Sequence, residues 1–168
     1  DLDIRAVKIG MLSRVEAIAA VTESLGRHAA QNIVLDPVMV ATLGGKLLAD
    51  NAVAALRTGL MPRALVVTPN LPEAAALLGT TPARSEDEME SQARALMKLG
   101  AQAVLIKGGH GSGAESVDLL VEEAGVTRLS ARRIATQNTH GTGCTLSSAI
   151  AAGLAKGLEL ASAARAAK

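Results

Sequence analysis

The sequence predicts an α/β fold in which helices cover both faces of a mostly parallel sheet, giving three layers. Four short apolar runs, at 6–12, 32–39, 64–68 and 101–107, are continuous rather than alternating, which is typical of strands buried on both faces. Segments with helical periodicity separate these runs, and two further strand-like runs surround a turn near Gly125. At 168 residues, 49% apolar and 20% charged, the chain fits one folded domain, and this composition excludes a disordered protein.

The order of elements follows from where each periodic pattern begins and ends. Ser13 with Glu16, and Ser85 with Glu88, have the capping-box spacing that starts a helix, while a glycine such as Gly26 is a common stop. We expect strand 6–12, helix 13–26, strand 32–39, helix 50–60, strand 64–68, helices 70–78 and 85–100, strand 101–107, antiparallel strands 116–121 and 126–130, and helices 144–156 and from 158 onward. The segment 42–46 reads as a connection.

Charge and composition restrict the possible partners and location. A net charge of +1 indicates neither nucleic acid nor an acidic membrane as a partner. The single cysteine excludes an internal disulfide and is compatible with a reducing compartment. No apolar run approaches the ~20 residues of a membrane span. We therefore expect a cytoplasmic protein with no nucleic-acid or membrane partner.

Two features of the chain are unusual. It contains no Phe, Tyr or Trp, although aromatic side chains commonly dominate core energetics, so we infer either a deliberately restricted composition or an engineered or trimmed chain. It begins at Asp1 without Met, enters an apolar segment almost at once, and ends inside an Ala-rich helical pattern. We therefore expect residues 1–168 to form a single domain trimmed at both ends. Because trimming a parallel sheet would leave apolar surface uncovered, we also expect a homo-oligomer.

The stretch 138–148 is the strongest candidate site. It places Gly141 and Gly143, with hydroxyls and a thiol, at the start of an Ala-rich helix. The N–H groups of a helix start, together with the helix dipole, favour a phosphate or another anion. The alternative is a Gly-rich loop entering a helix, with Thr142 or Thr145 as N-cap.

Polar residues also follow the predicted strands, where ligands bind in parallel sheets. Asp36 is either a turn former or a metal or electrostatic residue near phosphate. Lys107 is either a solvated lysine at a strand end or a phosphate contact. Asn70 and Glu73 have the spacing of a reciprocal helix cap, and Glu73 could instead organise Mg²⁺. These alternatives remain open from the residues alone.

Cys144 lies beside the predicted helix start, which favours a thiolate, so it could act as a base or touch the substrate. The alternative is a small buried apolar side chain. We interpret His110 and His140 as loop histidines. We expect no zinc site, because the C-x-x-C and Cys/His ligand spacings are absent.

Five motifs, taken together, resemble a known family. They are Lys8-Ile9-Gly10-Met11, Asp36-Pro37-Val38-Met39, Thr68-Pro69-Asn70-Leu71-Pro72-Glu73-Ala74, Lys107-Gly108-Gly109-His110 and Asn138-Thr139-His140-Gly141-Thr142-Gly143-Cys144-Thr145. Their order and spacing are similar to those of the hydroxymethylpyrimidine/phosphomethylpyrimidine kinases of thiamine biosynthesis, which have the ribokinase-like fold. The resemblance covers nearly the whole chain, but nothing here matches the Gly-rich segment and pyrimidine-binding glutamine with which that family begins.

The resemblance implies a catalytic anion hole, a substrate pocket, a nucleotide site and a magnesium position. The resemblance assigns the anion hole to Gly141, Thr142, Gly143 and Cys144, and the substrate pocket to Met11 and Val38. It assigns the nucleotide site to Lys107, Gly108, Gly109 and Asn70. The magnesium position is assigned to Asp36 and Glu73. Cys144 stands where most of the superfamily carries an aspartate base. The expected activity is therefore ATP- and Mg²⁺-dependent phosphorylation of hydroxymethylpyrimidine, a small pyrimidine, or of its monophosphate.

Two alternatives remain. The same scaffold and base position can serve pyridoxal kinase activity. The missing first segment and the absent aromatics favour a non-catalytic module that keeps the fold and binds a nucleotide or anion without turnover.

Overall fold

The computed structural model describes residues 2–39, 50–109, 114–136 and 141–168. Within these residues one six-stranded sheet runs in sequential order from β1 to β6. The first four strands are parallel, and the last two form an antiparallel hairpin beside β4. The strands are β1 (Val7–Ile9), β2 (Ile33–Leu35), β3 (Val66–Val67), β4 (Ala103–Lys107), β5 (Glu115–Glu122) and β6 (Gly125–Arg132).

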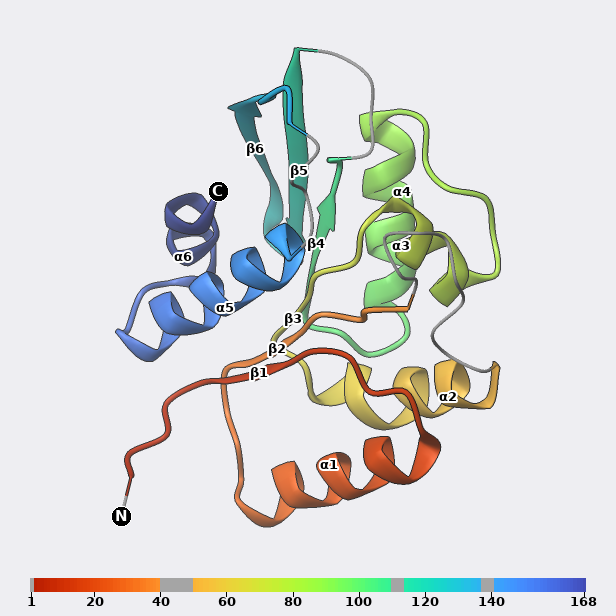
Figure 1. The fold of residues 1–168 in the computed structure, drawn as a ribbon, viewed down its shortest axis with the longest axis vertical. Helices are drawn as coiled ribbons and strands as arrows, with labels where there is room; N and C mark the ends of the chain where they lie inside the picture. The colour runs from red at the N-terminus through yellow and green to blue at the C-terminus, as the bar shows by residue number, and fades with distance from the viewer. Residues whose placement is uncertain (1, 40–49, 110–113, 137–140) are drawn as a thin grey trace.

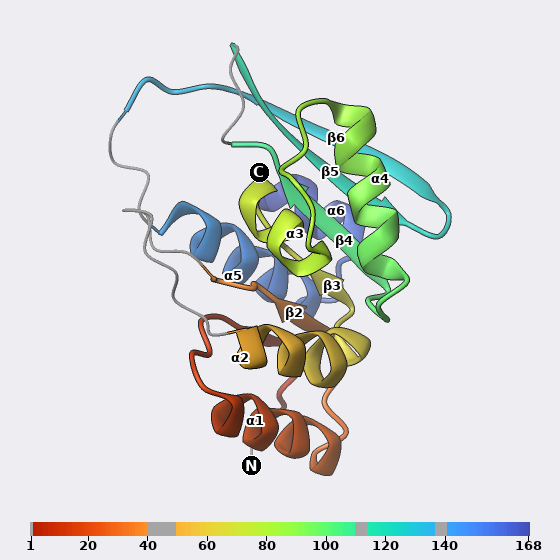
Figure 2. The same cartoon turned by 90° about the vertical axis from the view of Figure 1, so that its right-hand side faces the viewer.

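Helices cover both faces of the sheet, so the predicted three-layer α/β architecture is confirmed (Figure 1). One face carries α1 (Val15–Arg27), α2 (Asp50–Ala55), α3 (Leu71–Leu78) and α4 (Glu86–Met97); the other carries α5 (Thr142–Ala155) and α6 (Leu160–Ala167). The chain continues from α2 through a π-helical turn, Leu56–Leu60, and a 3₁₀ turn, Met61–Arg63. Figure 2 shows the β5–β6 hairpin extending beyond the shorter parallel strands.

The continuous apolar runs form strands because both faces of the sheet are covered. Successive strand residues point to opposite faces. Leu35 and Val67 accordingly join the core beneath α1 to α4, whereas their neighbours Val34 and Val66 join the core beneath α5 and α6. All four side chains are fully buried.

Two of the predicted helix starts are correct. Asn70 caps α3: its side chain accepts from Glu73 N–H while the Glu73 carboxylate accepts from Asn70 N–H, both at 2.8 Å. The helix ends at Gly79, whose φ of 70° is the left-handed conformation that glycine favours. Ser85 caps α4 by accepting from Glu88 N–H.

Two other helix starts differ from prediction. The capping box expected from Ser13 and Glu16 is wrong, because α1 begins after Arg14 with no side-chain cap, and Gly26 lies inside the helix rather than after it. The N-cap of α5 is neither Thr142 nor Thr145 but Gly141, with φ of 81°. A glycine adopts this conformation without the strain that a threonine would carry.

Some of the predicted features lie outside the described residues: the connection 42–46, His110, and the motif residues Asn138, Thr139 and His140. Among the helices that the structure describes, none has the length and apolar character needed to cross a membrane.

Candidate active site

Strand register brings the predicted site residues to one edge of the sheet. Leu35 of β2 pairs with Val67 of β3, so Asp36 and Thr68 follow their strands side by side. Farther out, Asn70 bridges to Lys107, the last residue of β4. The carboxyl ends of parallel strands are the usual ligand-binding edge of such a sheet.

Asp36 is the centre of a buried polar network. Its side chain is 1% exposed. One carboxylate oxygen accepts from Lys107 Nζ at 2.8 Å and from Thr68 Oγ1 at 3.2 Å, and the other accepts from Ser147 Oγ at 3.1 Å. Lys8 Nζ lies 3.9 Å from that second oxygen. The burial of this carboxylate is therefore compensated by two cations and two hydroxyls.

Lys8, Thr68 and Ser147 were not among the predicted site residues. Ser147 comes from α5, 111 residues after Asp36, and no local spacing links the two. Thr68 and Lys8 lie inside motifs that were noted for their neighbours. Thr68 could have been identified by its position directly after β3, beside Asp36 after β2, whereas Lys8 lies inside β1.

Glu73 is buried, with 3% of its surface exposed, at the start of α3. Burial raises the pKa of its carboxyl above the ordinary value, and the negative charge of Asp36 adds to this rise. The Lys107 ammonium and the N–H groups of Asn70 and Met39 lower the pKa, but they do not cancel the effect of burial. The helix cap predicted from Asn70 and Glu73 is thus present, and Glu73 also lies within the field of Asp36 and Lys107.

The amino terminus of α5 lies against Lys107. A Cβ built on Gly143 would come within 2.9 Å of Lys107 Nζ, so this ammonium lies directly against the first turn of the helix. The first turn of a helix has N–H groups without intrahelical partners, and its dipole favours an anion. A helix start and a lysine ammonium therefore meet at one point, a combination suited to phosphate.

Cys144 follows in the same turn and is exposed, so the alternative of a small buried apolar residue is wrong. Ser147, one turn later, is fully buried. Its hydroxyl lies within 3.1 Å of the backbone carbonyl oxygens of Gly143 and Cys144, and 3.1 Å from the carboxylate of Asp36. It thereby ties the first turn of α5 to Asp36.

The remaining predicted residues lie around this edge. Met11 is 57% exposed after β1, and Val38 is half-buried after β2. After β4, Gly108 is buried and its N–H donates to Asp118 at 2.9 Å, whereas Gly109 is exposed.

The carboxylates of Asp36 and Glu73 are suited to holding a magnesium ion through water. Both oxygens of Asp36 accept protein hydrogen bonds, and one oxygen of Glu73 accepts from Asn70. In the part of the chain that the structure describes, no three His, Cys, Asp or Glu side chains are grouped as metal ligands. A Mg²⁺ ion that keeps its hydration shell on bound phosphates meets these conditions.

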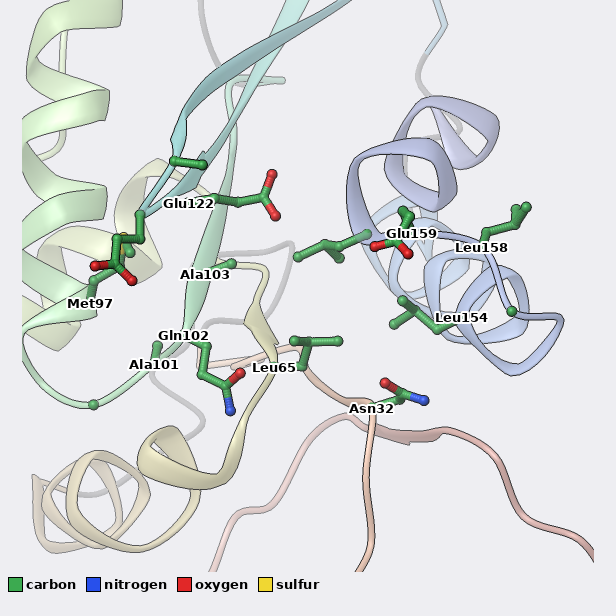
Figure 3. A pocket seen from close by; sticks show the side chains of 15 residues that line it. Asn32, Leu65, Met97, Ala101, Gln102, Ala103, Glu122, Leu154, Leu158 and Glu159 are labelled. Atoms are coloured by element: carbon green, nitrogen blue, oxygen red, sulfur yellow. The ribbon is translucent and has the colours of Figure 1, made fainter.

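A hollow near the amino ends of the parallel strands, away from Asp36, contains none of the predicted site residues (Figure 3). It lies between the start of β4 and the α5–α6 connection, with Leu65 and Leu154 beside Gln102, Glu122 and Glu159. These side chains offer no combination of a nucleophile, a base and a phosphate contact, so the candidate active site is the edge around Asp36.

Comparison with known proteins bears on this site. A family model described as phosphomethylpyrimidine kinase matches residues 1–168. The chain belongs to this family. The hydroxymethylpyrimidine/phosphomethylpyrimidine kinase of Rhizobium meliloti is 58% identical over 168 residues, which are all of this chain and 63% of that protein. The Escherichia coli kinase of the same name is 52% identical over 152 residues, 90% of this chain and 57% of that protein. The chain therefore spans about three fifths of the length of these curated relatives.

Solved structures agree with the family assignment and with a ribokinase-like fold. A Clostridium difficile phosphomethylpyrimidine kinase superposes with a TM-score of 0.83 at 38% identity, covering 98% of this chain and 66% of that one. Bacillus subtilis pyridoxal kinase, in an ADP complex, gives 0.88 at 38% identity, covering 97% and 60%. Staphylococcus aureus pyridoxal kinase with AMP-PCP and pyridoxal gives 0.89 at 35% identity, covering 97% and 58%.

Proposed function

We propose that this chain carries the nucleotide site of an ATP-dependent kinase that phosphorylates hydroxymethylpyrimidine or its monophosphate in thiamine biosynthesis. The observation that carries the proposal is the meeting of Lys107 Nζ with Gly143 at the amino terminus of α5. Family membership and the names of the relatives support the substrate class. The structural neighbours solved with ADP and AMP-PCP support ATP as the donor.

The chemistry that we propose is an in-line transfer dominated by positioning and charge stabilisation. The acceptor oxygen forms a bond to the γ-phosphorus as the bond to the bridging oxygen breaks and ADP leaves. The helix start at Gly141, Thr142, Gly143 and Cys144 holds the charge that develops on the γ-phosphoryl group. Cys144, exposed in this turn, takes or orients the proton of the acceptor hydroxyl.

Around this centre, the remaining residues hold the two ligands. Lys107, Gly108, Gly109 and Asn70 line the nucleotide side, and Lys107 adds positive charge near the phosphates. Met11, with its exposed thioether, and Val38 form the apolar wall for the pyrimidine ring. These two groups follow strands that end at the same edge.

Magnesium completes the proposal. Asp36 and Glu73 would hold the ion through its bound waters, and the ion would supply positive charge to neutralise phosphate. Because Lys107 Nζ pairs with Asp36 at 2.8 Å, the negative charge of this carboxylate is already neutralised before nucleotide binds.

We further propose a cytoplasmic location and self-association of the chain, neither of which the chemistry requires.

Two other functions can be distinguished from the proposed one by experiment. Pyridoxal kinase activity is favoured by the likeness to two pyridoxal kinases. The other alternative is the non-catalytic module, which keeps the fold and binds a nucleotide or anion without turnover.

The deciding experiment measures ADP release with Mg·ATP and hydroxymethylpyrimidine, its monophosphate or pyridoxal, with a no-acceptor control. Release dependent on either pyrimidine supports the proposal, and release with pyridoxal alone identifies the second function. Binding of AMP-PCP by folded protein without any release identifies the non-catalytic module. Absence of both binding and release overturns the nucleotide site.

A further inference from the structure

Asp118 is a buried carboxylate that the proposed chemistry does not use. It lies on β5 opposite Lys107 of β4, and its side chain is 4% exposed. One oxygen accepts from Gly108 N–H at 2.9 Å, and the other accepts from Lys168 Nζ at 2.8 Å. The carboxylate therefore has a distinct partner on each oxygen, one of them in the proposed nucleotide site.

Gly108 has no freedom to move toward β5. A Cβ at this position would collide with the carbonyl oxygen of Val117, so the backbone of Gly108 packs directly on the neighbouring strand. Its N–H is held by Asp118 on the same strand. A steric limit and a charge-assisted hydrogen bond thus fix the same residue.

The next residue is held by the same hairpin. Arg133, just after β6, donates from Nη1 to the carbonyl oxygen of Gly109 at 2.7 Å and from Nη2 to that of Glu115 at 3.2 Å. On the other side, Lys107 N–H donates to the Pro69 carbonyl at 2.8 Å. The segment 107–109 is therefore fixed on both sides, and its first residue carries the ammonium that lies against Gly143.

We propose that Asp118 is a positioning residue of the nucleotide site, which holds the backbone at Gly108 so that Lys107 and Gly109 present their groups to bound nucleotide. The proposal rests on the proposed function, because it assigns nucleotide to this edge. Asp118 acts through Gly108 and does not itself touch nucleotide. Lys168 serves this role by neutralising the buried carboxylate with its ammonium.

The test compares D118A and D118N with the parent chain. In D118A the buried Gly108 N–H loses its acceptor, and we expect AMP-PCP affinity, measured by calorimetry, to fall on the order of tenfold or more. D118N keeps an oxygen that can accept from Gly108 and should recover most of this affinity. Hydrogen exchange of the Gly108 and Gly109 amides, followed by NMR, should speed up in D118A and much less in D118N.

A matched control removes a carboxylate from the far end of the same strand. Glu122 lies beside the hollow near the amino ends of the parallel strands, at the last position of β5. E122Q should therefore leave both the AMP-PCP affinity and the amide exchange unchanged. Circular dichroism establishes that each variant is folded, and if D118A does not fold, D118L replaces it with an isosteric side chain that lacks the acceptor.

The outcomes separate this inference from the proposed function. A folded alanine or leucine variant at position 118 with parental AMP-PCP affinity overturns the positioning role, even if its amide exchange is faster. Affinity lost equally in D118N and the variants without an acceptor also overturns it, because charge rather than the Gly108 hydrogen bond would then matter. A parent chain that does not bind AMP-PCP overturns the proposed nucleotide site, and the positioning role falls with it.

Discussion

Cys144 is the residue on which the proposed proton transfer depends. It is exposed in the first turn of α5. A positioned base contributes roughly 10²–10⁴-fold to such a transfer, so C144A should lower kcat by that order while the Kd for AMP-PCP stays near the parental value. S162A, which removes an exposed serine hydroxyl on α6, is the control and should change neither constant. Equal losses of turnover and nucleotide affinity in C144A would remove the base role.

Glu73 makes stability depend on pH. Burial raises the pKa of its carboxyl in the folded protein above that in the unfolded chain, so the folded state holds its proton to higher pH. Its contribution to stability is therefore fully present below the unfolded pKa and is lost as pH rises through the folded pKa. Gln at this position cannot lose a proton. The stability of the parent relative to E73Q should consequently fall as pH rises from about 4, near the ordinary glutamate pKa, through the raised pKa of the folded protein.

Urea unfolding of both proteins across this pH range measures that difference. E16Q, which removes an exposed glutamate in the first turn of α1, is the matched control for the loss of one carboxylate from the chain. A difference between E73Q and the parent that stays constant with pH would mean that the Glu73 carboxyl titrates alike in both states.

At the scale of elements, the β4–β5 pair is held by close backbone contact at Gly108. A Cβ there would collide with the Val117 carbonyl, whereas at Gly109 the nearest side-chain atom is 4.0 Å away. We expect G108A to lower the free energy of unfolding by at least about 2 kcal/mol, and G109A by less than about 1 kcal/mol. Thermal and urea unfolding of the two neighbouring variants provide the comparison. Equal destabilisation by G108A and G109A would show that β4 and β5 can move apart at Gly108 without a large loss of stability.

The elements that could be predicted are those whose signals are local. Four continuous apolar runs gave the four parallel strands, and the spacing of Asn70 and Glu73 gave the cap of α3. The start of α1 was misplaced because Ser13 and Glu16 have the capping spacing without forming the hydrogen bonds. A local pattern is a weak guide where the chain leaves a buried strand, since packing of the helix then decides where it begins.

The site could be predicted only in part for a related reason. Motifs located Asp36, Lys107 and the helix start near Gly143, because each follows a strand or opens a helix. The contacts of Asp36 with Ser147 and Lys107 join residues 111 and 71 positions apart. Only strand order and register determine such contacts. The sequence therefore identified the groups at this edge, but not the network that neutralises Asp36.

For the whole molecule, self-association is the remaining prediction, and β1 is where we expect it. Among the described strands β1 ends the sheet, and the segment before it carries Leu2, 90% exposed, and Ile4, 72% exposed. An edge strand with exposed apolar neighbours is a template for pairing with another chain. The double variant L2K/I4K should therefore have a lower weight-average mass in sedimentation equilibrium than the parent at the same concentration. I134K adds one lysine, against two in L2K/I4K, at a position 79% exposed after β6, the strand at the other side of the sheet, and should leave the mass unchanged. A parent that is monomeric at every concentration, or one dissociated by I134K instead, would show that β1 is not the interface.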